Sequence, residues 1–124
     1  MERQLPVVTT AIDAATATTT SQVIDVQNAK KIMCQFTRAN HSSGSTAFKV
    51  EGSVDGTTYD DCMLVKQVAN TNAQNYLRQM SVTLSANGTE HWAVDLSYFA
   101  FKTIKVTATE TTDGTHTAKV LIEY

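Results

Sequence analysis

Residues 46–56 read TAFKVEGSVDG, a run in which apolar and polar side chains alternate and which closes with an Asp-Gly pair. Phe48 and Val50 fall on one face of this run, and charged side chains fall on the other. This period of two is typical of a β-strand with one buried face. The closing Asp-Gly pair favours a tight hairpin turn, because glycine accepts the left-handed backbone conformation that such turns need. The run therefore predicts a strand that leads into a β-hairpin.

The same pattern recurs along the chain, and Asn87-Gly88 and Asp113-Gly114 repeat the turn signal. With 20 threonines, the sequence also favours pleated sheet. It predicts an all-β fold, an antiparallel β-sandwich of about eight strands that is jelly-roll-like. The further strands are expected over residues 22–26, 30–38, 58–66, 79–86, 89–95, 99–109 and 115–124. The inward side chains are expected to be Ile32, Cys34, Phe36, Met80, Val82, Leu84, Trp92, Val94, Ile104, Val106, Ala108, Ala118, Val120, Ile122 and Tyr124. Residues 58–66 carry apolar groups on both faces, so their phase stays open.

The first 21 residues differ from the rest, because residues 14–21 are of low complexity and lack large side chains. We expect residues 1–21 to form an extended N-terminal arm, with a short strand over residues 5–12, and residues 22–124 to form the sandwich domain. Two interpretations of the arm stand side by side. It is either a disordered terminus or a segment that lies on a neighbouring subunit.

Composition excludes several classes of protein. The chain has 124 residues, 18% charged and 42% hydrophobic, and a net charge of −2. That length fits one domain. A nucleic-acid binder would show a basic stripe, a disordered chain would be less apolar, and a membrane span would need about 20 consecutive apolar residues. No secretory signal begins the sequence, so we expect a soluble protein made in the cytoplasm.

The candidate reactive residues give no catalytic constellation. Cys34 and Cys62 are 28 positions apart, outside any Cys-x-x-Cys motif or paired histidine spacing, so we expect two reduced, buried thiols and no zinc site. A disulfide between neighbouring strands is the alternative that the sequence leaves open. His41, His91 and His116 have no orienting neighbour in the sequence, and we expect them at the surface or at strand edges. We therefore predict no catalytic, cofactor-binding or metal-binding residues and no enzymatic activity.

The acidic residues Asp55, Asp60 and Asp61 gather around one hairpin. A calcium site would need several oxygens that converge on one point. We expect instead that Asp55 serves the turn and that Asp60 or Asp61 caps the next strand.

A polar stretch, residues 67–78, is the longest part of the expected domain without periodicity, and long loops in compact domains are often functional. Trp92 falls on the core phase. Tyr76, near the end of the polar stretch, is the aromatic side chain that we expect to be available to a partner. A carbohydrate-binding module would need two or three exposed, coplanar aromatic rings, and this alternative stays open.

Residues 48–59, Phe-Lys-Val-Glu-Gly-Ser-Val-Asp-Gly-Thr-Thr-Tyr, resemble a hairpin that recurs in small β-sandwich proteins of tailed-phage virions. A similar hairpin occurs in galactose-binding-like domains of the discoidin type, which are longer, often disulfide-closed and secreted. In the hairpin, Gly52 allows a bulge or a close approach, Asp55-Gly56 makes the turn, and Tyr59 closes the end. The short length, the low charge and the arm make the chain look more like a phage capsid decoration (cement) protein.

This resemblance implies a structural role in the virion, with the major capsid protein as partner. It also implies self-association, for which a homotrimer would suit a capsid three-fold axis, and no binding to nucleic acid or membrane. Another phage particle component, such as a head–tail connector or a tail or fibre-associated sandwich, is the nearest alternative.

Overall fold

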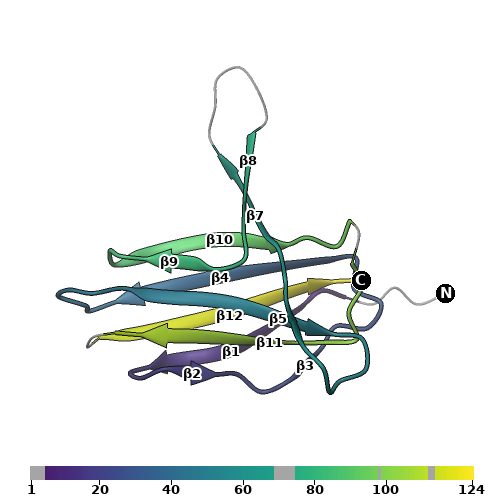
Figure 1. Ribbon diagram of the computed structural model, residues 1–124, viewed down its shortest axis with the longest axis horizontal. Helices are drawn as coiled ribbons and strands as arrows, with labels where there is room; N and C mark the ends of the chain where they lie inside the picture. Colours follow the sequence, from purple (N-terminus) through teal and green to yellow (C-terminus); the bar gives the residue numbers. More distant parts are fainter. Residues whose placement is uncertain (1–4, 69–74, 98, 112–113) are drawn as a thin grey trace.

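The computed structural model describes residues 5–68, 75–97, 99–111 and 114–124 and arranges them as antiparallel strands in two facing sheets (Figure 1). The expected all-β sandwich is confirmed. The first sheet has the strand order β1-β12-β4-β10-β7-β8, and the second has the order β2-β11-β5-β6, with β3 beside β11 and β9 beside β5. The strands are β1 Val7–Ala15, β2 Thr19–Thr20, β3 Ile24–Asp25, β4 Lys31–Ala39, β5 Thr46–Ser53, β6 Asp60–Asp61, β7 Leu64–Val68, β8 Asn75–Gln79, β9 Val82–Leu84, β10 Gly88–Val94, β11 Thr103–Glu110 and β12 Thr115–Glu123. Among the described residues, no helix has the length and apolarity needed to cross a bilayer.

The connectivity is that of a jelly roll. Without β6, β7 and β8, the sheets reduce to the orders β1-β12-β4-β10 and β2/β3-β11-β5-β9. Two interleaved Greek keys produce this pattern, in which successive strands cross from one sheet to the other except at β5 and β9, which pair within the second sheet. The three strands left out are consecutive in the chain. They form an insertion between β5 and β9, and the hairpin of β7 and β8 extends the edge of the first sheet.

The core lies between the sheets and follows the predicted alternation. Phe36 on β4 and Phe48 on β5 stack across it, with ring centroids 4.6 Å apart. Most of the expected inward side chains are buried: Ile32, Cys34, Phe36, Val82, Leu84, Trp92, Val94, Ile104, Val106, Ala108, Ala118, Val120 and Ile122. Met80 is the wrong prediction, since it is 45% exposed. Met80 lies between the end of β8 and the start of β9. The alternation of inward and outward side chains in β9 therefore does not include it. Tyr124 is half-buried.

The stretch over residues 58–66 was expected to be one strand and is two. Asp60–Asp61 pairs with β5 in the second sheet, and Leu64–Val68 pairs with β10 in the first. The chain changes sheets between them. Cys62 and Leu64 point inward, while Met63 is half-buried, which settles the phase left open by the sequence.

The N-terminal segment is part of the sandwich over residues 7–15. Val7–Ala15 pairs with β12, and Ile12 is buried in the core. Ala14 adopts a φ of 46° where the pairing register shifts. An edge strand of this kind buries apolar surface and completes the first sheet, so the boundary expected after residue 21 does not set residues 7–15 apart from the domain. Contact with a neighbouring subunit stays a prediction.

Candidate functional site

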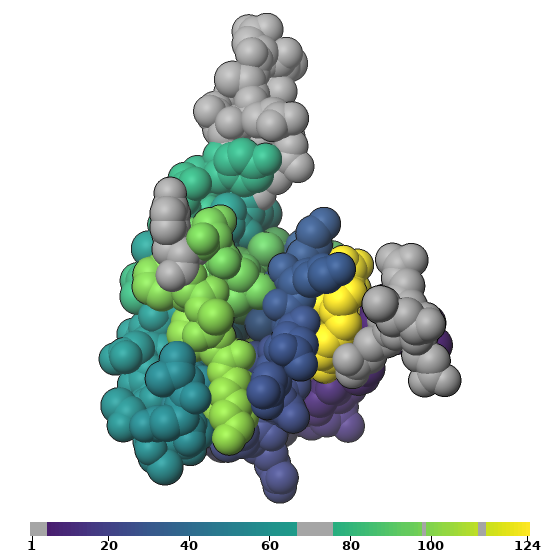
Figure 2. Space-filling view, turned by 90° about the vertical axis from the view of Figure 1, so that its right-hand side faces the viewer, coloured from purple at the N-terminus to yellow at the C-terminus, as the bar shows by residue number. Residues whose placement is uncertain are grey.

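The β7–β8 hairpin projects from the body of the sandwich (Figures 1 and 2). β7 pairs with β10 only at Leu64 and Val65, but it pairs with β8 along its whole length. Because the pairing with β10 stops there, the distal part of the hairpin extends beyond the sheet. Within the described chain, β8 pairs with β7 alone, so its outer edge presents unpaired backbone groups.

The polar stretch expected as one loop, residues 67–78, therefore contains strand at both of its ends. The middle of it, residues 69–74, lies outside the described residues. Tyr76 and Leu77 on β8 are 46% and 45% exposed, so the expected exposure of Tyr76 is confirmed, and its contact with a partner stays a prediction. Aromatic and large apolar side chains of this kind are enriched at protein interfaces.

An apolar cleft of about 450 Å³ lies where the insertion meets the sandwich. We call it the foot cleft. Its lining residues are Val54, Asp60, Asp61, Cys62, Met63, Met80, Phe99, Ala100 and Phe101. The rings of Phe99 and Phe101 are nearly parallel, with centroids 6.3 Å apart. Of the lining side chains, Val54, Met80 and Phe99 are the large apolar ones exposed to solvent.

Gly52 allows the wall of the foot cleft to form. A Cβ at this position would lie 2.4 Å from Cδ1 of Phe101, so the ring rests directly on the glycine backbone. The close approach expected at Gly52 is thus confirmed. Cys62, one of the lining residues, is a free and buried cysteine. Cys34 is also free and buried. Burial raises the pKa of both thiols to about 12. The nearby Cys62 contributes further for Cys34, and the nearby carboxylates of Asp61 and Glu51 contribute further for Cys62. The expected pair of reduced, buried cysteines is confirmed.

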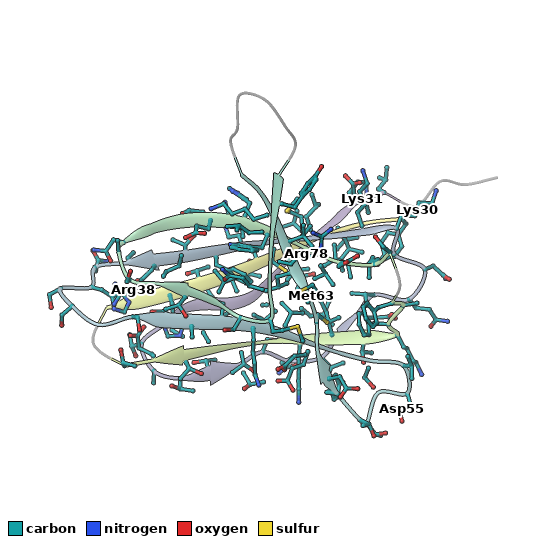
Figure 3. The ribbon with its side chains drawn as sticks, turned by 45° about the horizontal axis from the view of Figure 1, so that its top comes forward. Lys30, Lys31, Arg38, Asp55, Met63 and Arg78 are labelled. Atoms are coloured by element: carbon teal, nitrogen blue, oxygen red, sulfur yellow. The ribbon has the colours of Figure 1, made fainter. Side chains whose placement is uncertain are left out.

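The Asp55-Gly56 turn lies beside the cleft, at the opposite end of the sandwich from Arg38 (Figure 3). Oδ1 of Asp55 accepts hydrogen bonds from the backbone N–H groups of Thr57 and Thr58, at 2.8 and 3.0 Å, and from the Ser53 hydroxyl. These donors hold the pKa of the Asp55 carboxyl well below its usual value. The turn role predicted for Asp55 is confirmed. Asp60 and Asp61 form β6 itself and do not cap a strand.

The histidines do not all lie where the sequence predicted. His91 is an exposed strand residue whose Nε2 lies 3.2 Å from Nε2 of Gln35, as expected. His41 and His116 are buried, and both reach the carboxylate of Glu110. We call His41, Glu110 and His116 the histidine cluster. The prediction was wrong for two of the three histidines, because the jelly roll brings together the loop after β4, the end of β11 and the start of β12.

The histidine cluster lies next to a buried arginine. Arg38 donates from Nε to the Thr46 hydroxyl at 3.1 Å, and the Thr46 hydroxyl donates to Oε2 of Glu110 at 2.6 Å. Arg38 also donates from Nη2 to the Ser43 carbonyl. Buried charges are tolerated when they are hydrogen-bonded and paired, and this chain of donors links the arginine to the glutamate.

Taken together, the fold and its surface define a jelly-roll β-sandwich with a projecting hairpin inserted between β5 and β9. No protein-family model matches the chain, and no curated protein matches it. Among solved structures, the crystal structure of the SPBc2 prophage-derived protein YomS is similar, with a TM-score of 0.64 over 100% of this chain and 99% of that one. The two sequences are 14% identical, so the likeness is one of fold.

Proposed function

We propose that this chain is a structural protein of a tailed-phage particle, which decorates the capsid and stabilises it by binding between capsomers. The observation that carries the proposal is the β7–β8 hairpin. It offers an unpaired strand edge together with exposed Tyr76 and Leu77 on the projecting strand β8. A surface of this composition suits attachment to another protein.

An exposed strand edge can bind a partner through its unpaired backbone groups. A partner strand that adds to β8 gains main-chain hydrogen bonds, while the side chains of alternate residues supply anchors. The foot cleft, with Met80 and Phe99 at its rim, offers a second apolar contact on the same insertion. Only 18% of the residues are charged, which lowers the desolvation cost of burying the surface. Repeated attachment on a symmetric shell would multiply the strength of each weak contact.

Two independent likenesses support the phage setting. The hairpin over residues 48–59 resembles one in tailed-phage virion proteins, and the whole fold is similar to that of a prophage-derived protein. The partners proposed are the major capsid protein and further copies of this chain, as a homotrimer at a capsid three-fold axis. The location proposed is the virion. Another particle component, at the head–tail connection or on the tail, is the nearest rival.

Binding to particles tests the hairpin directly. A double variant, Tyr76→Ser with Leu77→Ser, is mixed with heads of the phage that encodes the chain, prepared without this protein, and its co-sedimentation is compared with that of the wild type. We expect at least about tenfold weaker binding, the loss typical of removing interface anchors. Val23→Ser is the matched control, since Val23 is an exposed apolar residue elsewhere on the sandwich.

The position on the particle decides between head and tail. Electron microscopy of the virion with the chain labelled is expected to show it at symmetric positions between capsomers. Density on the tail, or absence from the purified virion, would refute decoration. Binding to glycans that Tyr76→Ser abolishes, without any association with particles, would favour the carbohydrate-binding alternative instead.

A further inference from the structure

We infer that the histidine cluster binds one transition-metal ion of the Zn²⁺ class. One ligand atom from each of His41, Glu110 and His116 lies within 4.8 Å of the others. Both imidazole side chains are fully buried, and the carboxylate is 2% exposed. The three residues come from three segments at the end of the sandwich where Arg38 lies (Figure 3). This inference replaces the expectation, drawn from sequence spacing, that the chain has no metal site.

The donor set matches what zinc prefers. Two imidazole nitrogens and one carboxylate oxygen form a common set of three protein ligands, with bonds of about 2.0–2.2 Å. In a tetrahedron of such bonds, neighbouring ligand atoms lie roughly 3.3–3.5 Å apart. Oε2 of Glu110 lies 3.3 Å from Nε2 of His41 and 3.2 Å from Nδ1 of His116. The carbonyl oxygen of Thr115 lies 3.1 Å from the same His41 nitrogen.

Three buried nitrogens in the cluster make no hydrogen bond, namely Nδ1 of His41 and both ring nitrogens of His116. Buried polar atoms are rarely left without a partner, and an ion is one of the recognised reasons. An ion held by Nε2 of His41 and Nδ1 of His116 would account for Nδ1 of His116 among the three. His116 is the decisive case. Its Nδ1 is within hydrogen-bond distance of Oε2 of Glu110 yet makes no hydrogen bond to it, so the oxygen lies off the direction of the nitrogen lone pair. Two atoms that share an ion are placed in this way, because each points at the ion and not at the other.

The surroundings of the cluster hold its ligands in place, as outer-shell contacts do in metal sites. The Thr46 hydroxyl donates to Glu110. The side chain of Asn87 accepts from the backbone N–H of His41 at 3.0 Å and donates to the backbone carbonyl of His41 at 2.9 Å. At Gly114, a Cβ would lie 2.4 Å from Cδ2 of His41, so the imidazole rests on glycine backbone.

Charge sets a limit on the affinity. The site offers one carboxylate against a divalent ion, and the buried Arg38 adds a positive charge nearby. We therefore expect weaker binding than in closed sites with several thiolates.

The test uses the full chain, freed of metal with a chelator and titrated with Zn²⁺ by calorimetry and with Co²⁺ by visible absorption. We expect one ion per chain and a tetrahedral Co²⁺ spectrum. We also expect a rise in Tm on the order of 10 °C at about a hundredfold excess of Zn²⁺ over Kd. His116→Gln and Glu110→Gln should abolish binding. His91→Gln, which alters the exposed histidine, should leave it unchanged.

A readout on the wild type alone covers the case in which a cluster variant fails to fold. Nitrogen NMR of the imidazole rings should show that Zn²⁺ shifts the signals of His41 and His116 and leaves those of His91 in place. The inference is overturned if the folded wild type binds no Zn²⁺. It is also overturned if His91→Gln abolishes binding, or if Zn²⁺ shifts His91 alone, since either would show an adventitious surface ion only. None of these results bears on particle binding by the hairpin.

Discussion

Phe36 and Phe48 face each other from opposite sheets, with ring planes inclined by 16° and centroids 4.6 Å apart. Both rings are fully buried. Edge contact with His116, whose ring centroid is 6.3 Å from that of Phe48, joins this pair to the histidine cluster. The stacked pair is therefore the contact that couples the packing of the two sheets.

Truncation of this pair should destabilise the protein strongly. Phe48→Ala removes a buried ring and leaves a cavity between the sheets, so the free energy of unfolding should fall by about 3–5 kcal/mol. Urea denaturation followed by Trp92 fluorescence measures the change. Val54→Ala is the control, because Val54 is 74% exposed, and its effect should stay within about 0.5 kcal/mol. A small effect of Phe48→Ala would contradict the assignment of the core.

Gly114→Ala should also destabilise the protein, for two reasons. Gly114 has a φ of +96°, which costs a residue with a side chain about 1–2 kcal/mol, and the added methyl would overlap the His41 ring. Overpacking adds about 1–3 kcal/mol. Gly56→Ala separates the terms, since Gly56 has a φ of +84° but no atom within 4 Å of the position of a Cβ. Equal losses of Tm in the two variants would show that His41 does not pack against Gly114.

The Asp55 turn should make stability depend on pH. Its hydrogen bonds lower the pKa of the carboxyl in the folded state, so the ionised form stabilises the fold above the unfolded pKa of about 3.9. That contribution is lost as the pH falls below 3.9 toward the lowered value. Asp55→Asn should thus be less stable than the wild type at pH 7, and the gap in free energy of unfolding should narrow between pH 4 and pH 2. A gap that stays constant over this range would show that the ionised Asp55 carboxyl does not stabilise the folded state.

The two cysteines should resist thiol reagents in the folded protein. With their pKa raised to about 12, Cys34 and Cys62 stay protonated at neutral pH, and the thiolate is the reactive form. Labelling with a disulfide reagent should follow the rate of unfolding and become rapid in denaturant. Val54→Cys supplies an exposed thiol beside the foot cleft as a positive control. Labelling of two cysteines in the folded wild type as rapid as that of the control would show that the thiols are accessible.

Local pattern predicted much of the sandwich. The alternation of apolar and polar residues predicted the core residues of β4, β5, β11 and β12, because a strand with one buried face has an apolar side chain at every second position. The pattern failed where the chain changes sheet, as at Cys62. It predicted the short strand over residues 5–12 but not that this strand, β1, belongs to the sandwich. Pairing partners such as β1 and β12 are too distant in the chain for local pattern to reveal.

The histidine cluster shows the same limit more sharply. His41 and Glu110 are 69 positions apart in the numbering of the chain and lie in contact only because β11 and β12 cross the sandwich in a jelly roll. No rule based on sequence spacing predicts a contact between residues so far apart in the chain. The exposure of Tyr76 was predicted correctly because Tyr76 falls in a polar stretch that shows no alternation and therefore has no core-facing phase.

The placement of the hairpin within the chain has a consequence for how such a protein changes over generations. β6, β7 and β8 occupy a single connection of an otherwise regular jelly roll. The exposed side chains of β8 can be changed without disturbing the pairing of the other strands, whereas Cys62 and Leu64 of the same connection are buried in the core. The architecture thereby separates a constrained part of this connection from a part that is open to variation.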